Sequence, residues 1–399
     1  MVALTGGFGP FNATQLTGLL QDVVAQQRQQ LQHTILHDVQ YRAGAYYAIA
    51  EVHAQPPDGP VAQNYYGITT AVVPPGATGY HRQILETPVF VWQHPTDPLL
   101  PGLGLAATPA QVQRHFGPRH ELSALHTVIY RPMNRAVFQA RFAPQHPGEV
   151  GKTLFLKVLR AGEAQPLYTL HRLLAAADVP VVKPVSLPVK EVLALAGGHG
   201  MPLGEYIRSE GVHNRFDPVE LVEILDRFPA AVMQLPHRPS WADRYEEFIA
   251  TAIEAMPEQA DRLRQLEARL HQAHERLELG PVVPTHGDLY EAHILVNPVT
   301  GRVQHILDVD GAGPGYRVDD YACFIGHLTV LGHNDTTAWG WQAARRAYER
   351  LAPYTHPTAL AVRSAAVVIS LIPTYQRTTE AKTRGNAYLR MAEALMDLV

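Results

Sequence analysis

The sequence predicts an α+β protein with a β-rich lobe, a mainly helical lobe after it, and an extra α/β region before both. Three observations lead to this prediction. The 399 residues are enough for two or three domains of ordinary size. Short runs rich in β-branched and aromatic residues dominate up to about residue 195, and helical periodicity dominates after it. Strands segregated from helices in this way are typical of the α+β class.

The composition fits a folded protein, with 46% hydrophobic and 18% charged residues. The net charge of −4 excludes a generally basic nucleic-acid binder. The single cysteine, Cys323, excludes a disulfide framework and indicates a reducing compartment. The best apolar run, Ala365–Ile372, is too short to span a membrane, and Met1–Pro10 lacks the features of a secretory signal. We therefore expect a cytoplasmic monomer or homodimer without membrane or nucleic-acid partners.

The first predicted region, residues 1–115, begins with one helix over residues 13–36, which Thr14 can cap. Strands and a short helix follow, separated by segments rich in proline and glycine. These elements are Val39–His53, Asn64–Val73 and Pro88–Trp92 as strands and Pro109–Phe116 as a helix. The proline-rich segment Pro95–Gly104 is predicted to be a loop or linker near the first domain boundary.

The second predicted domain, residues 116–197, contains five strands and one inserted helix. The strands are Leu125–Tyr130, Ala136–Phe142, Thr153–Leu159, Val182–Val185 and Glu191–Leu195, and the helix is Glu163–Ala177. The third domain, residues 198–399, is predicted to be helical apart from a short β-rich island over residues 282–310.

The stretch from Thr285 to Leu295 carries the residues with the clearest chemistry. Asp288 precedes position 293 by five residues, and Asp308 follows a short predicted hairpin. Phosphoryl transfer needs one carboxylate to orient and deprotonate an acceptor hydroxyl and further ligands to hold Mg²⁺ against the phosphates. The spacing of these three positions matches that of kinases.

Lys157 lies in the apolar strand Leu154–Val158 and alternates toward the interior. Such a lysine commonly reaches the surface along a strand edge, but a buried one requires a partner. Its place before the Asp288 loop favours a phosphate-binding role, as in kinases, with Glu163 as the nearest candidate carboxylate.

Three motifs resemble the signature of the aminoglycoside phosphotransferase-like kinases, a superfamily that includes choline, fructosamine, maltose and glucosamine kinases. The motifs are His286-Gly287-Asp288, Ile306-Leu307-Asp308 and Asp319-Asp320-Tyr321-Ala322. The resemblance covers about residues 120–399 and includes the segment Tyr130–Arg135. Residues 1–115 resemble the cap and intermediate regions of the actinobacterial maltokinase and glucosamine kinase branch in length and strand content.

The resemblance implies a two-lobed protein-kinase-like fold with an N-terminal cap region, and ATP and Mg²⁺ as cofactors. It implies that Asp288 is the catalytic base and Asp308 the residue that bridges Mg²⁺ to the nucleotide. It also implies that Lys157 binds phosphates. The hinge that holds adenine corresponds to Leu193–Ala196, which includes Leu195, and Asp320 corresponds to a residue that braces the catalytic loop.

Three features depart from the family pattern. His293 stands where relatives have Asn or Gln, and imidazole suits Mn²⁺ and softer metals better than Mg²⁺. The turn between the first two strands has no glycine, so Arg131 and Arg135 would contact phosphates directly. Glu163, the candidate partner of Lys157, lies only near the start of the helix that follows the lysine.

Several site assignments have open alternatives. Asp310 is either a further metal ligand or the cap of a turn next to Gly311. A zinc site of His286, His293 and Asp308 is a minor alternative, because it leaves Asp288 without a role. Trp339 and Trp341 are interpreted as packing residues rather than as a sugar platform.

The sequence therefore predicts an ATP-dependent kinase whose acceptor is a small hydroxylated metabolite, with a sugar or amino sugar favoured. One alternative is an antibiotic phosphotransferase, in which an acidic wall binds a polycation. The wall would consist of Asp217, Glu220, Glu223, Asp243, Glu246 and Glu247. A second alternative is a pseudokinase that binds nucleotide or a protein partner without turnover.

Overall fold

The computed structural model describes residues 11–42, 44–144, 146, 148–210, 213–334, 339–372 and 379–399. Met1–Pro10, where we found no secretory signal, lies outside these residues. The chain forms two compact units, Met1–Tyr168 with Pro184–Gly197 and Thr169–Lys183 with Gly198–Val399. The first is rich in strands and the second in helices, so the predicted α+β class is confirmed. The predicted domain boundaries stay a prediction.

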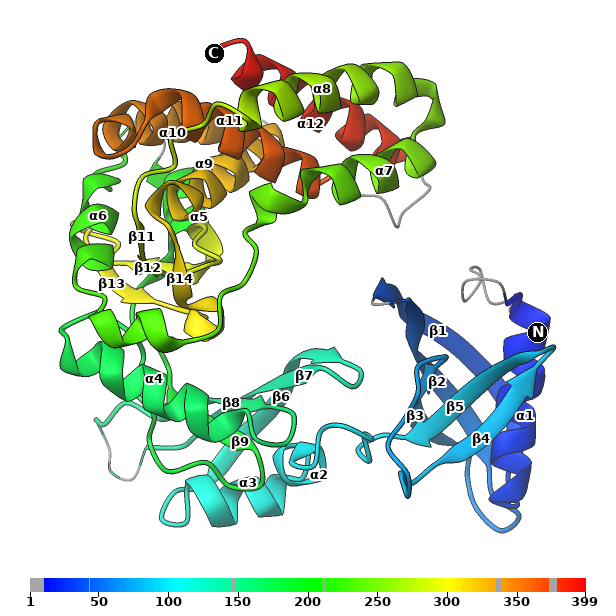
Figure 1. The fold of residues 1–399 in the computed structure, drawn as a ribbon. Coiled ribbons are helices and arrows are strands. Elements are labelled where there is room, and N and C mark those ends of the chain that lie inside the picture. The colour runs from blue at the N-terminus through cyan, green and yellow to red at the C-terminus, as the bar shows by residue number, and fades with distance from the viewer. Residues whose placement is uncertain are drawn as a thin grey trace. The chain divides into compact units, whose positions relative to one another are not determined.

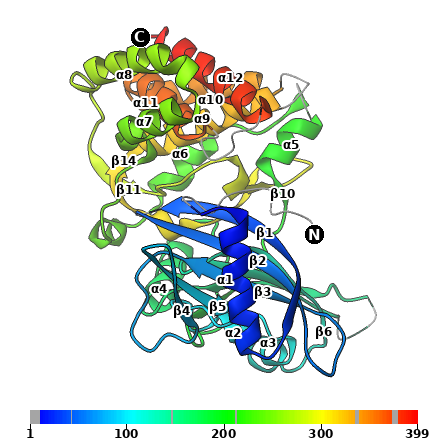
Figure 2. The same ribbon diagram turned by 90° about the vertical axis from the view of Figure 1, so that its right-hand side faces the viewer.

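The N-terminal part of the first unit is a five-stranded antiparallel sheet whose order is β1-β2-β3-β5-β4. Its strands are β1 (Gln30–Arg42), β2 (Ala45–Gln55), β3 (Ala62–Thr69), β4 (Tyr80–Ile84) and β5 (Thr87–Gln93). Helix α1 (Ala13–Gln26) lies across one face of the sheet (Figures 1 and 2). Its apolar stripe, which includes Leu16, Leu20 and Val23, forms a core with the inward side chains of the strands. An Asn12–Gln15 capping box starts this helix, so the predicted Thr14 cap is wrong.

The predicted helix over residues 13–36 is wrong beyond Gln26. The backbone at Arg28 has φ +57°, which ends the helix, and Gln30 begins a strand. The register of β1 shifts twice, between Leu31 and His33 and between Leu36 and Val39. Bulges of this kind interrupt the alternation that marks a strand, which is why the apolar residues here suggested a helix.

The predicted single strand Val39–His53 is divided in the structure into the end of β1, a hairpin turn and most of β2. Gly44 has φ +76° at this turn, a conformation that favours glycine. Strand β4, which pairs with β5, was missed because its side chains are mostly polar. The strands predicted at Asn64–Val73 and Pro88–Trp92 correspond to β3 and β5.

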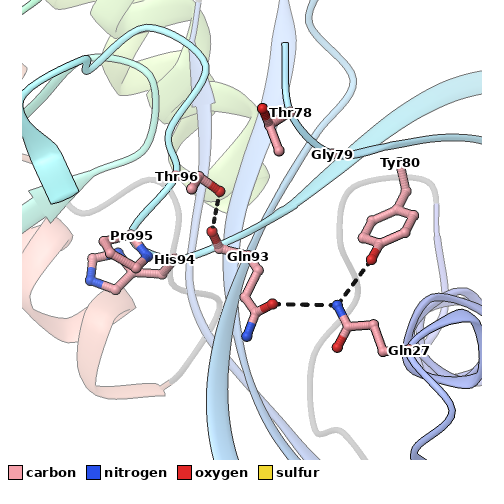
Figure 3. Close-up of a pocket in the computed structure, with 8 residues that line it drawn as sticks. All are labelled: Gln27, Thr78, Gly79, Tyr80, Gln93, His94, Pro95 and Thr96. Atoms are coloured by element: carbon pink, nitrogen blue, oxygen red, sulfur yellow. Dashed lines mark hydrogen bonds between the residues drawn. The ribbon is translucent and has the colours of Figure 1, made fainter.

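Gln27, at the C-terminal end of α1, connects the helix to the sheet through its amide. Its Nε2 donates to the hydroxyl of Tyr80 at 3.0 Å and to Oε1 of Gln93 at 3.3 Å, while its Oε1 accepts from Tyr66 at 3.0 Å. Gln27, Tyr80 and Gln93 border an open groove of about 460 Å³ (Figure 3), which His94 and Thr96 also line. These three hydrogen bonds of the Gln27 side-chain amide hold the C-terminal end of α1 against the sheet.

The second sheet of this unit has the antiparallel order β6-β7-β8-β9. The elements are α2 (Leu103–Ala106), α3 (Pro109–Phe116), β6 (Leu122–Arg131), β7 (Arg135–Phe142), β8 (Lys152–Val158) and β9 (Val192–Ala196). Helix α4 (Ala164–Ala176) begins in this unit and belongs to the second unit from Thr169 onward. The sheet has four strands and not the five that we predicted. Val182–Val185 forms only isolated bridges, at Pro184 with Leu195 and beside it at Val181 with Ile306.

The turn between β6 and β7 is attached to the N-terminal part of the same unit. The buried carboxylate of Asp97 accepts hydrogen bonds from the hydroxyl of Tyr130 at 2.7 Å and the backbone N–H of Met133 at 2.9 Å. The indole of Trp92 donates to Tyr130 at 3.2 Å, and the side chain of Met133 is buried beside Trp92. Arg42 donates to the backbone oxygen in this turn at residue 132.

The second unit contains short strands and most of the helices. Its strands are β10 (Met201–Pro202), β11 (Val282–Thr285), β12 (Ile294–Val296), β13 (Val303–Ile306) and β14 (Gly313–Tyr316). Its helices are α5 (Leu203–Glu210), α6 (Val219–Asp226), α7 (Tyr245–Ala255), α8 (Ala260–His274), α9 (Arg317–Asn334), α10 (Trp339–Leu351), α11 (Pro357–Ser370) and α12 (Thr379–Met396).

Helix α11 lies at the centre of this helical group, next to α7, α8, α9 and α12 (Figure 1). It is buried over Ala359–Ile369, which explains its apolar sequence. The run Ala365–Ile372 therefore belongs to a protein core. Within the part of the chain described here, no helix combines the length and apolarity needed to cross a membrane.

We predict that Asp97→Ala lowers the free energy of unfolding of the chain by about 2–4 kcal/mol, because it leaves the Tyr130 hydroxyl and the Met133 N–H buried without an acceptor. Thermal unfolding, with Asp58→Ala in an exposed turn as control, measures the effect. Equal melting temperatures for the two variants would contradict the assignment.

Candidate active site in the second unit

The loop that carries Asp288 lies between β11 and β12. Strand β12 pairs with β13 in a tight antiparallel hairpin, and the N–H of Leu307, just after β13, donates to the carbonyl of His293 at 2.8 Å. The two ends of the hairpin are therefore adjacent. This geometry brings Asp308, the next residue, beside the end of the Asp288 loop.

Asp288, His293 and Asp308 form a cluster in which each offers one ligand atom, all within 4.8 Å of one another. Nε2 of His293 lies 3.5 Å from Oδ2 of Asp308, and its Nδ1 lies 4.0 Å from Oδ2 of Asp288. The side chains are partly exposed, at 33% for Asp288 and 19% for Asp308. Two carboxylates and an imidazole at this separation fit a divalent cation.

The hydrogen bonds of His293 determine which of its nitrogens can bind a metal. Nδ1 lies 2.9 Å from the backbone oxygen of Asp288, which can only accept, so Nδ1 carries the proton. Nε2 is therefore the ring nitrogen that is left to face Asp308. Metal-binding histidines characteristically donate their other ring N–H to a backbone carbonyl or a carboxylate in this way.

His286 holds the loop in place from within the protein. Its Nε2 donates to the backbone oxygen of Leu307 at 2.9 Å, and its Nδ1 accepts from the N–H of Asp288 at 3.3 Å. Burial lowers the pKa of His286 to about 4, so the ring is neutral near pH 7. Since both ring nitrogens are occupied, His286 does not contribute to the alternative zinc site with His293 and Asp308.

Asp320 braces the same loop, as the family resemblance implied. Its two carboxylate oxygens accept from the backbone N–H groups of His286 at 2.9 Å and of Gly287 at 2.8 Å. Burial raises the pKa of Asp320 to about 6. Gly287 has φ +82°, and a Cβ there would lie 2.4 Å from the oxygen of Gly311. Only glycine fits at this position of the loop.

Trp241 is a residue of the site that the sequence analysis missed. Its indole Nε1 donates to Oδ1 of Asp288 at 2.9 Å. We weighed Trp339 and Trp341 instead, and both lie on α10. The only sequence signal near Trp241 is the preceding Ser240, with Asp243 three residues later, which is typical of a helix start and not of a catalytic site.

The residues expected to bind nucleotide lie in the first unit. Lys157 is on β8, directly between Val137 of β7 and Leu193 of β9. Glu163 precedes α4, and its carboxylate pairs with Arg160 at 2.5 Å. A role of Glu163 as the partner of Lys157 stays a prediction.

Three further expected groups are located as follows. Leu193 and Leu195 are on the edge strand β9 with buried side chains, so only their backbone could bind adenine. Arg131 and Arg135 pair with each other at the base of the β6–β7 turn. Asp310 lies in a short 3₁₀ turn, Val309–Gly311, and is not part of the three-residue cluster described above. Its role as a ligand stays a prediction.

A sequence model described as the phosphotransferase enzyme family matches residues 146–360, which is more than half of the chain. The matched segment includes Lys157, Asp288, His293 and Asp308. No curated protein matches the chain.

Three solved structures illustrate the likeness in three dimensions. A spectinomycin phosphotransferase in complex with ADP and spectinomycin is 13% identical with a TM-score of 0.49, covering 72% of this chain and 96% of its own. The macrolide 2′-phosphotransferase of Brachybacterium faecium is 20% identical with a TM-score of 0.40, covering 71% and 98%. The choline kinase of Cryptosporidium parvum is 13% identical with a TM-score of 0.45, covering 73% and 96%. At these scores the likeness carries no argument of its own.

We predict that, as the pH falls below 6.5, the free energy of unfolding decreases less in His327→Gln than in the wild type. Burial lowers the pKa of His327 to about 4. Between pH 6.5 and 4 this histidine is therefore protonated in the unfolded chain but still neutral in the folded chain. The stability associated with the neutral ring is present above pH 6.5 and is lost toward pH 4. The shift corresponds to up to roughly 3 kcal/mol at pH 4.

Denaturant unfolding of the wild type and the variant at several pH values measures this difference. His356→Gln, at an exposed histidine, is the control and should leave the pH dependence unchanged. A His327→Gln profile parallel to that of the wild type would contradict the prediction.

Proposed function

We propose, from the premise that this chain belongs to the phosphotransferase enzyme family, that it transfers the γ-phosphoryl group of ATP to a hydroxyl of a sugar or amino sugar. The family consists of small-molecule kinases that use ATP and Mg²⁺, and this chain is such an enzyme. The observation that carries the proposal is the meeting of Asp288 and Asp308 with His293 at one potential cation site.

In this proposal the oxygen of the acceptor hydroxyl forms a bond to the γ-phosphorus of ATP, and the bond from that phosphorus to ADP breaks. Asp288 accepts the proton that the hydroxyl loses. Asp308 and His293 would hold the divalent cation, which when bound would supply positive charge opposite the phosphates. His286 and Asp320 keep the loop in place through the hydrogen bonds described above.

The nucleotide would be bound by groups of the first unit. We propose that Lys157 contacts the phosphates and that Arg131 and Arg135 replace a glycine-rich loop by direct charge contacts. The backbone of β9 at Leu193 and Leu195 would bind adenine. The cytoplasm is the expected compartment.

The charges of the second unit favour a neutral acceptor over a polycationic antibiotic. Four of the six acidic residues considered for a cation-binding wall already pair with arginines, at 2.7 to 3.1 Å. These pairs are Asp217–Arg350, Glu220–Arg302, Asp243–Arg363 and Glu247–Arg244. A carboxylate already neutralised by an arginine gains less from a second cation. We therefore favour a sugar hydroxyl over an aminoglycoside.

The orientation of His293 also weighs against a pseudokinase. Its Nδ1–H is held by a backbone oxygen so that Nε2 points toward Asp308. Metal-binding histidines are held in this way, with one ring N–H bonded to a backbone carbonyl and the other nitrogen directed to the site.

We predict that Asp288→Asn lowers turnover by at least about a thousandfold while nucleotide affinity changes little, because the amide cannot accept the hydroxyl proton. ADP release in the presence of glucose, maltose, glucosamine, kanamycin or choline identifies the acceptor. A fluorescent ATP analogue measures nucleotide binding. Asp261→Asn, at an exposed helical position, is the control. Wild-type turnover by Asp288→Asn would remove this residue from its role.

We predict that His293→Asn increases the ratio of Mg²⁺-supported to Mn²⁺-supported turnover by about tenfold, because an amide oxygen is a harder ligand than an imidazole nitrogen. Titration of ADP release with each metal gives the ratio. An unchanged ratio would show that His293 does not contact the cation.

A further inference from the structure

The indole of Trp241 lies beside the proposed catalytic base and is also open to solvent. Nε1 donates to Oδ1 of Asp288 at 2.9 Å, and the residue is 38% exposed. A partly exposed tryptophan that touches an active-site carboxylate is a suitable contact for a ligand, because it offers a large rigid surface at small entropic cost.

A buried arginine fixes the segment that carries Trp241. The short helix that starts at Trp241 has an Ser240–Asp243 capping box. The guanidinium of Arg363, which is fully buried, donates to Oγ of Ser240 at 2.8 Å and to Oδ1 of Asp243 at 2.7 Å. Although burial opposes it, the charge of Arg363 keeps the pKa of Asp243 below its usual value. The capping box therefore stays charged and intact near neutral pH.

The ring of Trp241 is also supported on its protein side. Phe248 of α7 stacks near it, with ring centroids 5.9 Å apart and an interplanar angle of 29°. With the backbone capped and the ring supported, the indole N–H points at Asp288 without the entropic cost of ordering a free side chain. This is the arrangement expected of a group that orients a reacting residue.

We propose that Trp241 forms the acceptor side of the site: its N–H fixes Oδ1 of Asp288 so that Oδ2 receives the hydroxyl proton, and its exposed ring packs against a ring of the acceptor. The inference rests on the proposed function and deepens it. Trp241 would thus act both as a positioning residue for Asp288 and as a determinant of acceptor specificity.

The surroundings of the ring favour an uncharged saccharide as the packing partner. The guanidinium of Arg244 already lies over Trp241 at 5.8 Å and over Phe248 at 5.0 Å from the ring centroids. A cationic acceptor would compete with this charge for the negative faces of the rings. The C–H face of a neutral sugar can pack on the indole without that competition.

Substitutions that separate the N–H group from the ring test this proposal. Trp241→Phe removes the donor and keeps an aromatic ring, whereas Trp241→Ala removes both. We expect Trp241→Phe to lower kcat about ten- to a hundredfold with KM within about twofold of wild type. Trp241→Ala should in addition raise KM for the acceptor about tenfold. Trp341→Phe, a similarly exposed tryptophan on α10, is the matched control and should behave as wild type.

The measurements are ADP release from full-length protein with Mg²⁺ and ATP, using glucose, maltose, glucosamine and kanamycin as acceptors. A wild-type kcat for Trp241→Phe would overturn the orienting role, and an unchanged KM for Trp241→Ala would overturn the packing role. Turnover of kanamycin or glucosamine, whose amino groups are protonated near pH 7, in preference to the neutral sugars would overturn the assignment of an uncharged saccharide. Thermal unfolding and binding of a fluorescent ATP analogue establish that the variants are folded. Trp241→Leu, which also lacks a donor, serves as a second variant should Trp241→Phe fail to fold, and a wild-type kcat for it would count equally against the orienting role.

The test separates this inference from the function on which it rests. If the wild type and Asp288→Asn are equally inactive toward every acceptor, the proposed function fails and this inference fails with it. If the wild type is active and Asp288→Asn is not, the kinetics of the Trp241 variants decide the inference alone.

Discussion

Two adjacent carboxylates at the start of α9 determine how the site in the second unit is held. Asp320 accepts the backbone N–H groups of His286 and Gly287, and Asp319 accepts from Nε of Arg363 at 2.6 Å. Arg363 in turn binds the segment that carries Trp241. One buried helix turn therefore controls the loop of the proposed base and the residue that touches it. Removing either carboxylate would leave buried donors without partners, which costs more than the hydrogen bond itself gains.

The buried arginine illustrates why this arrangement is stable. Arg363 has no exposed surface, yet its guanidinium meets two carboxylates, a serine hydroxyl and the Nε2 of His274 at 2.7 Å. A buried charge is tolerated only when its partners are this complete. The fork of five N–H donors suits this task, because a lysine at the same position could not reach all of these acceptors.

The sequence was sufficient for the parts of the site that depend on spacing along the chain. A hairpin of fixed length brings Asp308 next to His293, so the meeting of these residues with Asp288 could be predicted from the positions alone. The contact between Trp241 and Asp288 could not be predicted in this way, because Trp241 lies 47 residues before Asp288 and the fold of the chain brings the two together. In the same way the bulges of β1 concealed a strand whose apolar residues repeat at irregular intervals. Local periodicity predicts elements well where pairing is regular and fails where tertiary contacts shift the register.

The turn between β6 and β7 takes a left-handed conformation without a glycine. Met133 holds φ +57° in this turn, with its side chain buried and its N–H bonded to Asp97. A turn anchored in this way does not move independently of the residues that it contacts. Displacing the turn would break the hydrogen bonds that Tyr130 and Met133 donate to Asp97, so the position of the turn is tied to that of the segment after β5.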